Sequence, residues 1–340
     1  MKRLVSLLLF IAAAAVTPAA EPLFTITPIA DGVYAAISTP QYKTNCNAMI
    51  IVLDDSVLVV DTHSKPSAAR ALITEIKKIT DKPVRFVVNT HFHWDHTQGG
   101  QAYPAAWPLN LEIISSEKTR ENIERVGIPR VKTQLLGMPK DIYRIKGELA
   151  KATDPKVQAK LQDDLKQAEG FLEELKQMQL QLPTLTFERS MILRRGSRTV
   201  QFLFLGNAHT DGDIWVYLPK EKVLACGDAL HGWVPFMSDS YPYDWIKTLE
   251  AVEKLDFEHF LGGHGGVFHG KEQIKVWKSF LTDLLAETTQ AYSTGATMNE
   301  TVAQVLPKLT AKYNTSFPDF AQRAPGTIEK AWRMVSGDTK

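Results

Sequence analysis

Cysteine is nearly absent from this sequence, which has only Cys46 and Cys226 among its 340 residues. Two cysteines so far apart cannot form the framework of a small disulfide-stapled domain. Because Cys226 follows the apolar residues 223–225, we expect it to be a buried free thiol. Whether the two cysteines pair does not follow from the sequence.

An excess of charge of either sign is also absent. The chain has 39 Lys and Arg residues against 38 Asp and Glu, which gives a formal net charge of +1. Proteins that bind nucleic acid through its phosphates usually carry a basic stripe or face, and this sequence has no such stripe. We therefore expect a small-molecule substrate and no nucleic-acid partner.

Only the beginning of the chain carries a long apolar run. Residues 4–16 are almost all apolar, they follow Lys2 and Arg3, and the small residues at 17–20 suit cleavage. This run is too short to span a bilayer and is typical of a signal peptide. We expect residues 1–20 to be removed and the mature chain to be periplasmic or secreted, without a membrane contact. An uncleaved anchor is the alternative.

The mature chain, residues 21–340, is long enough for one large α/β domain or for two smaller ones, and we expect a single domain. Its first part predicts short strands at residues 24–29, 33–37, 48–53 and 57–60. A helix is predicted from Pro66 to about residue 80, followed by a strand at 84–88. This order of strand, helix and strand predicts a parallel pair, with ligands at the carboxyl ends of its strands.

Residues from about 115 to 182 differ from their surroundings, because they are rich in charged residues, glutamine and regularly spaced leucine. The spacing predicts a helical insertion folded as a hairpin. It could wall a substrate pocket or form a dimer contact.

After Pro183 the strand pattern returns. Strands are predicted at residues 184–187, 191–193, 199–205, 214–218 and 223–225, and helices at 244–255 and about 271–336. Two β-rich halves on either side of a helical insertion predict two packed sheets with helices outside.

Potential metal ligands are concentrated in a short segment that follows the strand 84–88, at His91, His93, Asp95 and His96. His91 and His93 are two residues apart, so they can share an ion only if the backbone is extended or looped. Asp95 and His96 are then free for a second ion. Imidazole and carboxylate donors suit Zn²⁺, or less selectively Mn or Fe, in a site that hydrolyses its substrate. A histidine-rich surface loop is the alternative.

Four further residues stand at predicted strand ends. Asp61 could accept a hydrogen bond from a ligand imidazole, although a turn-forming aspartate fits its position equally well. His209, Asp228 and His264 lie in glycine-containing segments, where a lone histidine is usually a turn residue. Together these three supply the ligands that two ions would still lack.

The order of these segments resembles that of the metallo-β-lactamase superfamily of binuclear metallohydrolases, over most of the mature chain from Asp61 to His264. The resemblance implies a four-layer αβ/βα sandwich with the site at the sheet edges. It also implies roles for individual residues, namely His91, His93 and His209 at a first Zn²⁺, Asp95, His96 and His264 at a second, Asp228 as a bridge between them, and Asp61 as a supporting acid. Asp95 and Asp228 are the catalytic candidates. More faintly, the leader, the insertion and residues 227–230 are similar to those of periplasmic zinc metallohydrolases of the quinoprotein relay type.

The predicted chemistry is hydrolysis. Two cations that share a water lower its pKa, and the hydroxide can attack a carbonyl carbon or a phosphorus. Several antibiotic-degrading members have Cys or Ser where this chain has Asp228. The leading prediction is therefore an exported hydrolase of an ester, thioester, lactone or lactam. A β-lactamase proper, a phosphodiesterase and a metal-binding accessory protein of an exported redox pathway are the alternatives.

Aromatic residues near the ligand segments are candidates for the substrate pocket. We expect Trp94, His231 and Trp233 to line it, although ordinary core packing explains these residues equally well. The residues after Asp228 are largely apolar and aromatic and no basic cluster accompanies them, which favours a neutral or monoanionic acyl substrate. The remaining histidines, His63, His259 and His269, are expected to be structural or on the surface.

Overall fold

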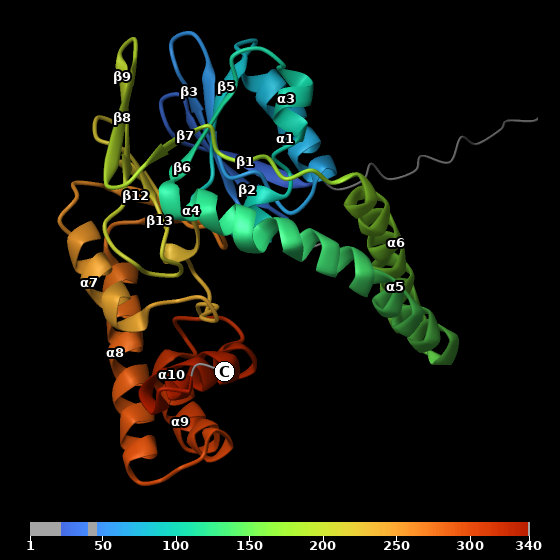
Figure 1. Ribbon diagram of the computed structural model, residues 1–340, viewed down its shortest axis with the longest axis vertical. Coiled ribbons are helices and arrows are strands. Elements are labelled where there is room, and N and C mark those ends of the chain that lie inside the picture. Colours follow the sequence, from blue (N-terminus) through green and yellow to red (C-terminus); the bar gives the residue numbers. More distant parts are fainter. Residues whose placement is uncertain (1–21, 40–45, 339–340) are drawn as a thin grey trace, which may run out of the picture.

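The computed structural model describes residues 22–39 and 46–338. It contains two mixed sheets, whose strands lie in the upper part of Figure 1. The predicted signal peptide lies outside the described residues, so its removal stays a prediction. Within the described ranges, no helix combines the length and the apolar character needed to cross a membrane.

The first sheet contains all the strands predicted before the insertion. Its seven strands lie in the order of the sequence: β1 (Phe24–Ala30), β2 (Val33–Ser38), β3 (Ala48–Val52), β4 (Val57–Val60), β5 (Val84–Val88), β6 (Glu112–Ser116) and β7 (Leu185–Phe187). Strands β1 to β4 pair antiparallel, whereas β4, β5, β6 and β7 are parallel. The parallel pair β4 and β5 was predicted; β6 was not, because its short apolar run adjoins the charged insertion.

The second sheet has six strands in the order β13 (Val267–His269), β12 (His259–Leu261), β11 (Val223–Ala225), β10 (Trp215–Leu218), β9 (Arg198–Leu203) and β8 (Ser190–Arg195). Its neighbours are antiparallel except for the parallel pair β11 and β12. Apolar side chains from the inner faces of both sheets form one buried cluster, in which Met49, Leu58 and Val88 belong to the first sheet and Phe202 and Val216 to the second.

Helices cover the outer face of each sheet. On the first sheet lie α1 (Pro66–Ile79) and α3 (Ala102–Ala106), whose Leu72 and Tyr103 pack in one cluster with Ile50 of β3. On the second lie α7 (Pro242–Val252) and α8 (Glu272–Ser293), which are followed by α9 (Met298–Tyr313) and α10 (Phe320–Ser336). The order helix, sheet, sheet, helix is the predicted four-layer αβ/βα sandwich.

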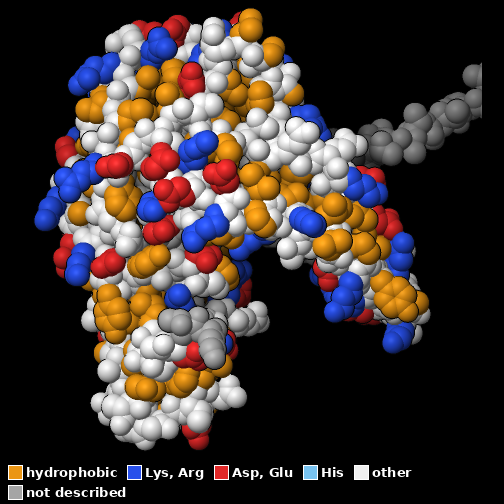
Figure 2. Space-filling view, viewed as in Figure 1, with side chains coloured by type: hydrophobic (Ala, Val, Ile, Leu, Met, Phe, Trp, Pro, Cys, Tyr) orange, Lys and Arg blue, Asp and Glu red, His pale blue; other side chains and the backbone are white. Residues whose placement is uncertain are grey.

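The predicted helical insertion forms α4 (Glu117–Asn122), a π-helix η1 (Ile123–Gly127), α5 (Ile128–Lys151) and α6 (Pro155–Gln177). Helices α5 and α6 make a hairpin that projects from the sandwich, and Figure 2 shows apolar, basic and acidic side chains interspersed over its visible face. The Asp154 carboxylate caps α6 by accepting hydrogen bonds from two backbone N–H groups. Glu174 anchors the hairpin by accepting hydrogen bonds from the backbone N–H and hydroxyl of Ser67. The dimer contact suggested for this insertion stays a prediction.

Both cysteines are buried and free. The Cys226 Sγ lies 3.1 Å from the carbonyl oxygen of Leu230, and burial raises the pKa of this thiol well above its ordinary value. The prediction of a buried free thiol at Cys226 is therefore confirmed.

Trp277 of α8 ties the outer helices to a loop that follows Asp228. Its side chain is fully buried, and its indole N–H donates to the carbonyl oxygen of His231 over 2.9 Å. We predict that Trp277→Ala lowers the free energy of unfolding by about 3–5 kcal/mol, because it leaves a large cavity in a packed core. Urea unfolding measures the loss. Tyr292→Ala, on the same helix but at a position that is 39% exposed, is the control and should cost about 1 kcal/mol or less; equal losses would contradict the prediction.

Candidate metal centre

The predicted ligand segments meet at one edge of the two sheets. Asp61 follows β4, the histidine-rich segment follows β5 and enters the short helix α2 (Trp94–Thr97), and Asp228 lies in the 3₁₀ turn η2 (Gly227–Ala229) after β11. Backbone hydrogen bonds join the two sheets here: the N–H of Ile214 donates to Thr90, and that of Asn47 to Gly263. The carboxyl ends of the parallel strands thus bring the side chains together, as expected for ligand sites in α/β sheets.

One group of potential ligands consists of His91, His93, His209 and Asp228, all buried, with one donor atom of each within 4.8 Å of all the others. The Nδ1 of His93 lies 2.9 Å from the Nε2 of His209. The same Nε2 is 3.7 Å from an Asp228 carboxylate oxygen. This group contains the three residues assigned to the first ion.

A second group consists of Asp95, His96 and His264, whose donor atoms also lie within 4.8 Å of one another. Asp228 is adjacent to this group as well. Its Oδ1 is 3.4 Å from the Nε2 of His96, and its Oδ2 is 3.3 Å from the Nε2 of His264. The structure therefore places Asp228 between the two groups, where a bridging ligand is expected.

The donor atoms fit cations. The Nε2 atoms of His91 and His96 and the Oδ1 of Asp228 are buried, and within the described ranges none of them has a hydrogen-bond partner. Buried polar atoms are almost always paired, so three orphans facing one small volume indicate an ion as the missing partner.

The pKa values of residues in the two groups also favour bound cations. Burial lowers the pKa of His209 to about 3, which keeps its ring neutral, as a metal ligand must be. Burial also disfavours the charged form of His264, but the carboxylates of Asp228 and Asp95 outweigh it and raise the pKa of His264 to about 9. The centre therefore favours positive charge close to its carboxylates.

Asp61 supports the ligands rather than capping a turn. Its Oδ2 lies 2.8 Å from the Nδ1 of His96, and its Oδ1 accepts a hydrogen bond from the backbone N–H of Thr90. Asp61 has a φ of 65°, an uncommon conformation for a residue other than glycine. A carboxylate that fixes the far nitrogen of an imidazole turns the other nitrogen toward the ion.

Asp239 has the same arrangement on the other side of the centre, and sequence reasoning missed it. One of its carboxylate oxygens lies 2.9 Å from the Nε2 of His93, whose Nδ1 faces His209. This hydrogen bond with His93 is the main cause that lowers the pKa of Asp239. The sequence carries no signal for this pair, because the two residues are 146 positions apart and Asp239 lies in an irregular loop.

Two glycines allow the ligands to approach. A Cβ atom on Gly263 would lie 2.1 Å from the Oδ1 of Asp228 and 2.7 Å from the Cε1 of His96. Gly227 has a φ of 48°, and a Cβ atom there would meet the Thr90 side chain. A side chain at Gly263 would displace Asp228 or His96, and one at Gly227 would displace Thr90 and require a strained backbone.

The three predicted pocket residues lie in different surroundings. Trp233 stacks on His264 with 4.7 Å between ring centroids and 12° between planes, whereas Trp94 faces Phe171 of α6 at 6.3 Å. His231 is 3% exposed and its Nδ1 accepts a hydrogen bond from the backbone N–H of Trp233, so it supports that residue from beneath. A contact between His231 and a substrate stays a prediction.

Phe236 is one of the apolar and aromatic residues after Asp228 that the sequence indicated beside the substrate. It is 59% exposed although it lies next to buried ligands, with ring centroids 5.9 Å from His93 and 6.5 Å from His209. Phe236 and Trp233 thus provide apolar surface beside the first and second groups, respectively.

The other histidines take structural or surface positions, as expected. His63 is buried, and its Nδ1 lies 2.8 Å from the carbonyl oxygen of Cys46. His259 and His269 pair across β12 and β13 at the surface, with 2.8 Å between their Nδ1 atoms.

Comparisons with known proteins agree with this geometry. Residues 42–186 match the family model of the metallo-beta-lactamase superfamily. The chain is 24% identical over 302 residues to a linear primary-alkylsulfatase from a Pseudomonas species, an alignment that covers 84% of this chain and 54% of that protein. The chain thus spans about half the length of that relative.

A solved structure, a metallo-beta-lactamase from Pontibacter korlensis, has a TM-score of 0.55 with this chain at 17% identity, and the match covers 76% of this chain and 99% of that one. This likeness confirms the fold. The fainter similarity to quinoprotein-relay metallohydrolases stays a prediction.

If the hydrogen bond between Asp239 and His93 orients a metal ligand, its removal should lower the affinity for zinc. We expect Asp239→Ala to weaken zinc binding about 10- to 100-fold, because the His93 ring loses the carboxylate that fixes its tautomer and orientation. Competition with a chromogenic chelator measures the affinity. Asp256→Ala, which removes a carboxylate that is 79% exposed, is the matched control. An Asp239→Ala protein that holds zinc as tightly as the control would show that the hydrogen bond does not support the ligand.

Proposed function

This chain contains a domain of the metallo-beta-lactamase superfamily, and from this premise we propose that it is a hydrolase that holds two divalent cations in the two ligand groups. The observation that carries the proposal is the position of Asp228, whose two carboxylate oxygens lie near ligands of both groups. A binding protein for a single ion has no need of a buried carboxylate between two sets of donors.

The chain's own residues would divide the work as follows. His91, His93 and His209 would hold one ion, Asp95, His96 and His264 the other, and Asp228 both. When bound, such cations lower the pKa of water toward neutrality and polarise the bond to be cleaved. Asp61 and Asp239, which lie within hydrogen-bond distance of His96 and His93, would keep these imidazoles in the tautomer that binds metal. Trp233 and Phe236 supply apolar surface beside the reacting groups.

The donor set of imidazoles and carboxylates suits Zn²⁺, with Mn and Fe as alternatives. We predict about two zinc ions per chain, because two complete groups of ligands are present. In the His264→Ala protein we expect about one, since the second group loses a donor. Elemental analysis of protein purified without chelator measures the stoichiometry.

The control for this measurement is His269→Ala, which removes an exposed imidazole that lies outside both groups and should leave the zinc content unchanged. A wild-type stoichiometry that stays at one ion under excess zinc would contradict the binuclear proposal.

For the substrate we propose an ester, thioester, lactone or lactam. The support is the apolar and aromatic surface at Trp233 and Phe236, which suits a neutral acyl group better than the anionic phosphoryl group of a phosphodiester. A second candidate is an alkyl sulfate. It is favoured by the similarity to the alkylsulfatase and, like the acyl substrates, joins an apolar chain to a hydrolysable ester.

We predict a higher kcat/KM for acyl substrates than for bis(p-nitrophenyl) phosphate in zinc-replete enzyme, because the pocket rather than the cations selects the substrate. A panel of chromogenic acyl ester, thioester, lactone, cephalosporin and sulfate ester substrates is assayed side by side. The Asp228→Ala protein provides the background, since it should lose activity and metal together. A phosphodiester preference would contradict the acyl proposal, and a sulfate ester preference would select the second candidate.

A further inference from the structure

Trp233 stands between the metal centre and a cation from the far end of the chain. The imidazole of His264 stacks on one face of the Trp233 ring, and the guanidinium carbon of Arg323 lies over the ring at 4.7 Å from its centroid. A stacked ring leaves no room for a second group on the same face, so the guanidinium lies on the opposite face. Sequence reasoning did not find this neighbour, because Arg323 belongs to the C-terminal helix α10, 90 positions after Trp233.

Arg323 is exposed, and among the described residues no carboxylate forms an ion pair with it. Its hydrogen-bonding edge is therefore available to a ligand, while the cation–π contact holds the plane of the guanidinium against Trp233. A guanidinium fork held in this way is suited to a planar carboxylate, which it can bind through two parallel hydrogen bonds.

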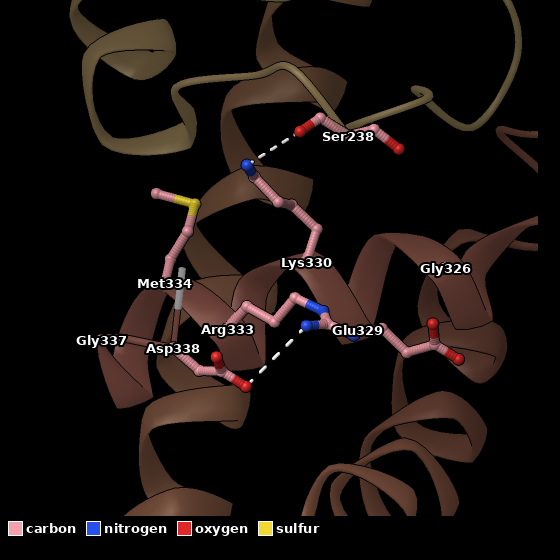
Figure 3. Close-up of a pocket in the computed structure, with 8 residues that line it drawn as sticks. All are labelled: Ser238, Gly326, Glu329, Lys330, Arg333, Met334, Gly337 and Asp338. Carbon is pink, nitrogen blue, oxygen red and sulfur yellow. Dashed lines mark hydrogen bonds and ion pairs between the residues drawn. The ribbon is translucent and has the colours of Figure 1, made fainter. Parts of the chain in front are cut away.

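Helix α10 is fixed to the loop that carries Trp233. The hydroxyl of Thr327 donates to the carbonyl oxygen of Pro235 over 3.0 Å. The Lys330 ammonium donates to the carbonyl oxygen of Ser238 over 2.9 Å, a bond that Figure 3 shows. Residues 323, 327 and 330 are spaced by four and three, so they lie on one face of the helix. Arg323 is thus held at a defined place beside the centre.

We propose that Arg323, seated on Trp233, is a binding subsite for a carboxylate that an acyl substrate carries at a distance from its scissile bond. The inference rests on the proposed hydrolase function and narrows its substrate class to monoanionic acyl compounds. The distance follows from the Trp233 ring, which separates the guanidinium from His264 and hence from the reacting group. The subsite supplies binding, so its removal raises KM and leaves kcat nearly unchanged.

The test compares two p-nitrophenyl acyl esters with the same leaving group, the neutral valerate and the glutarate monoester, which ends in a carboxylate. In Arg323→Gln we expect the KM of the glutarate monoester to rise about threefold to tenfold, the range for one charged contact that water partly screens. The KM of the valerate should stay within about twofold of wild type, since one apolar chain makes the same contacts in both proteins.

The matched control is Arg333→Gln, which removes the same charge from the same helix. Arg333 is directed toward Asp338, with 3.8 Å between the charged groups (Figure 3). Both esters should be hydrolysed by this protein as by wild type. Equal losses on both esters in Arg323→Gln, equal effects of the two arginine substitutions, or no change in either would overturn the subsite.

A binding measurement separates this inference from the proposed function. Isothermal titration of glutarate and of inorganic sulfate into the zinc-loaded wild-type and Arg323→Gln proteins requires no turnover. Weaker binding of glutarate to the variant, with sulfate unaffected, supports the carboxylate subsite even if neither ester is hydrolysed. Loss of sulfate binding alone would overturn the carboxylate assignment and point to a sulfate group as the anion.

Discussion

The buried carboxylate of Asp228 is the constraint on which the centre depends. An isolated carboxylate in a protein interior is costly unless cations or hydrogen-bond donors surround it. Here imidazoles from both sheets surround it, and interaction with His264 and His96 outweighs burial and keeps the pKa of Asp228 well below its ordinary value. The backbone must approach closely to allow this, which explains Gly227 and Gly263. The fold is thus adapted to hold negative charge at the point where the two ligand groups meet.

The orientations of two potential ligands are fixed by carboxylates that belong to neither ligand group. Asp61 bonds to His96 and Asp239 to His93, each at the ring nitrogen remote from the centre. Asp61 comes from the end of a central strand, while Asp239 comes from a loop braced by the outer helices. One supporting carboxylate therefore comes from a strand end of the first sheet and the other from a loop held by the outer helices, and loosening either part would loosen an imidazole.

The sequence predicted most of the fold and the seven residues that form the two ligand groups, for identifiable reasons. His91, His93, Asp95 and His96 are close together in the chain, so their spacing alone indicates a shared centre, and the strands beside them are recognisable as short apolar runs. Asp239 and Arg323 could not be found this way. Each lies in a loop or on a helix surface where such residues are ordinary, and each gains its meaning from a neighbour far away in the sequence. The short strand β6 was missed because charged helix formers follow it directly.

The C-terminal helices cover the second sheet and also hold the loop that follows Asp228. Helix α8 bonds to the carbonyl oxygen of His231 through Trp277, and α10 bonds to those of Pro235 and Ser238. One loop therefore carries Trp233 over His264, Phe236 beside His93 and His209, and Asp239 against His93, and its outer side is held by helices. A loop without such bonds would sample many conformations. Helices α8 and α10 therefore determine how this loop presents Trp233 and Phe236 beside the two ligand groups. Helix α10 also places Arg323 over Trp233, where its guanidinium can bind the part of a substrate that extends past the Trp233 ring.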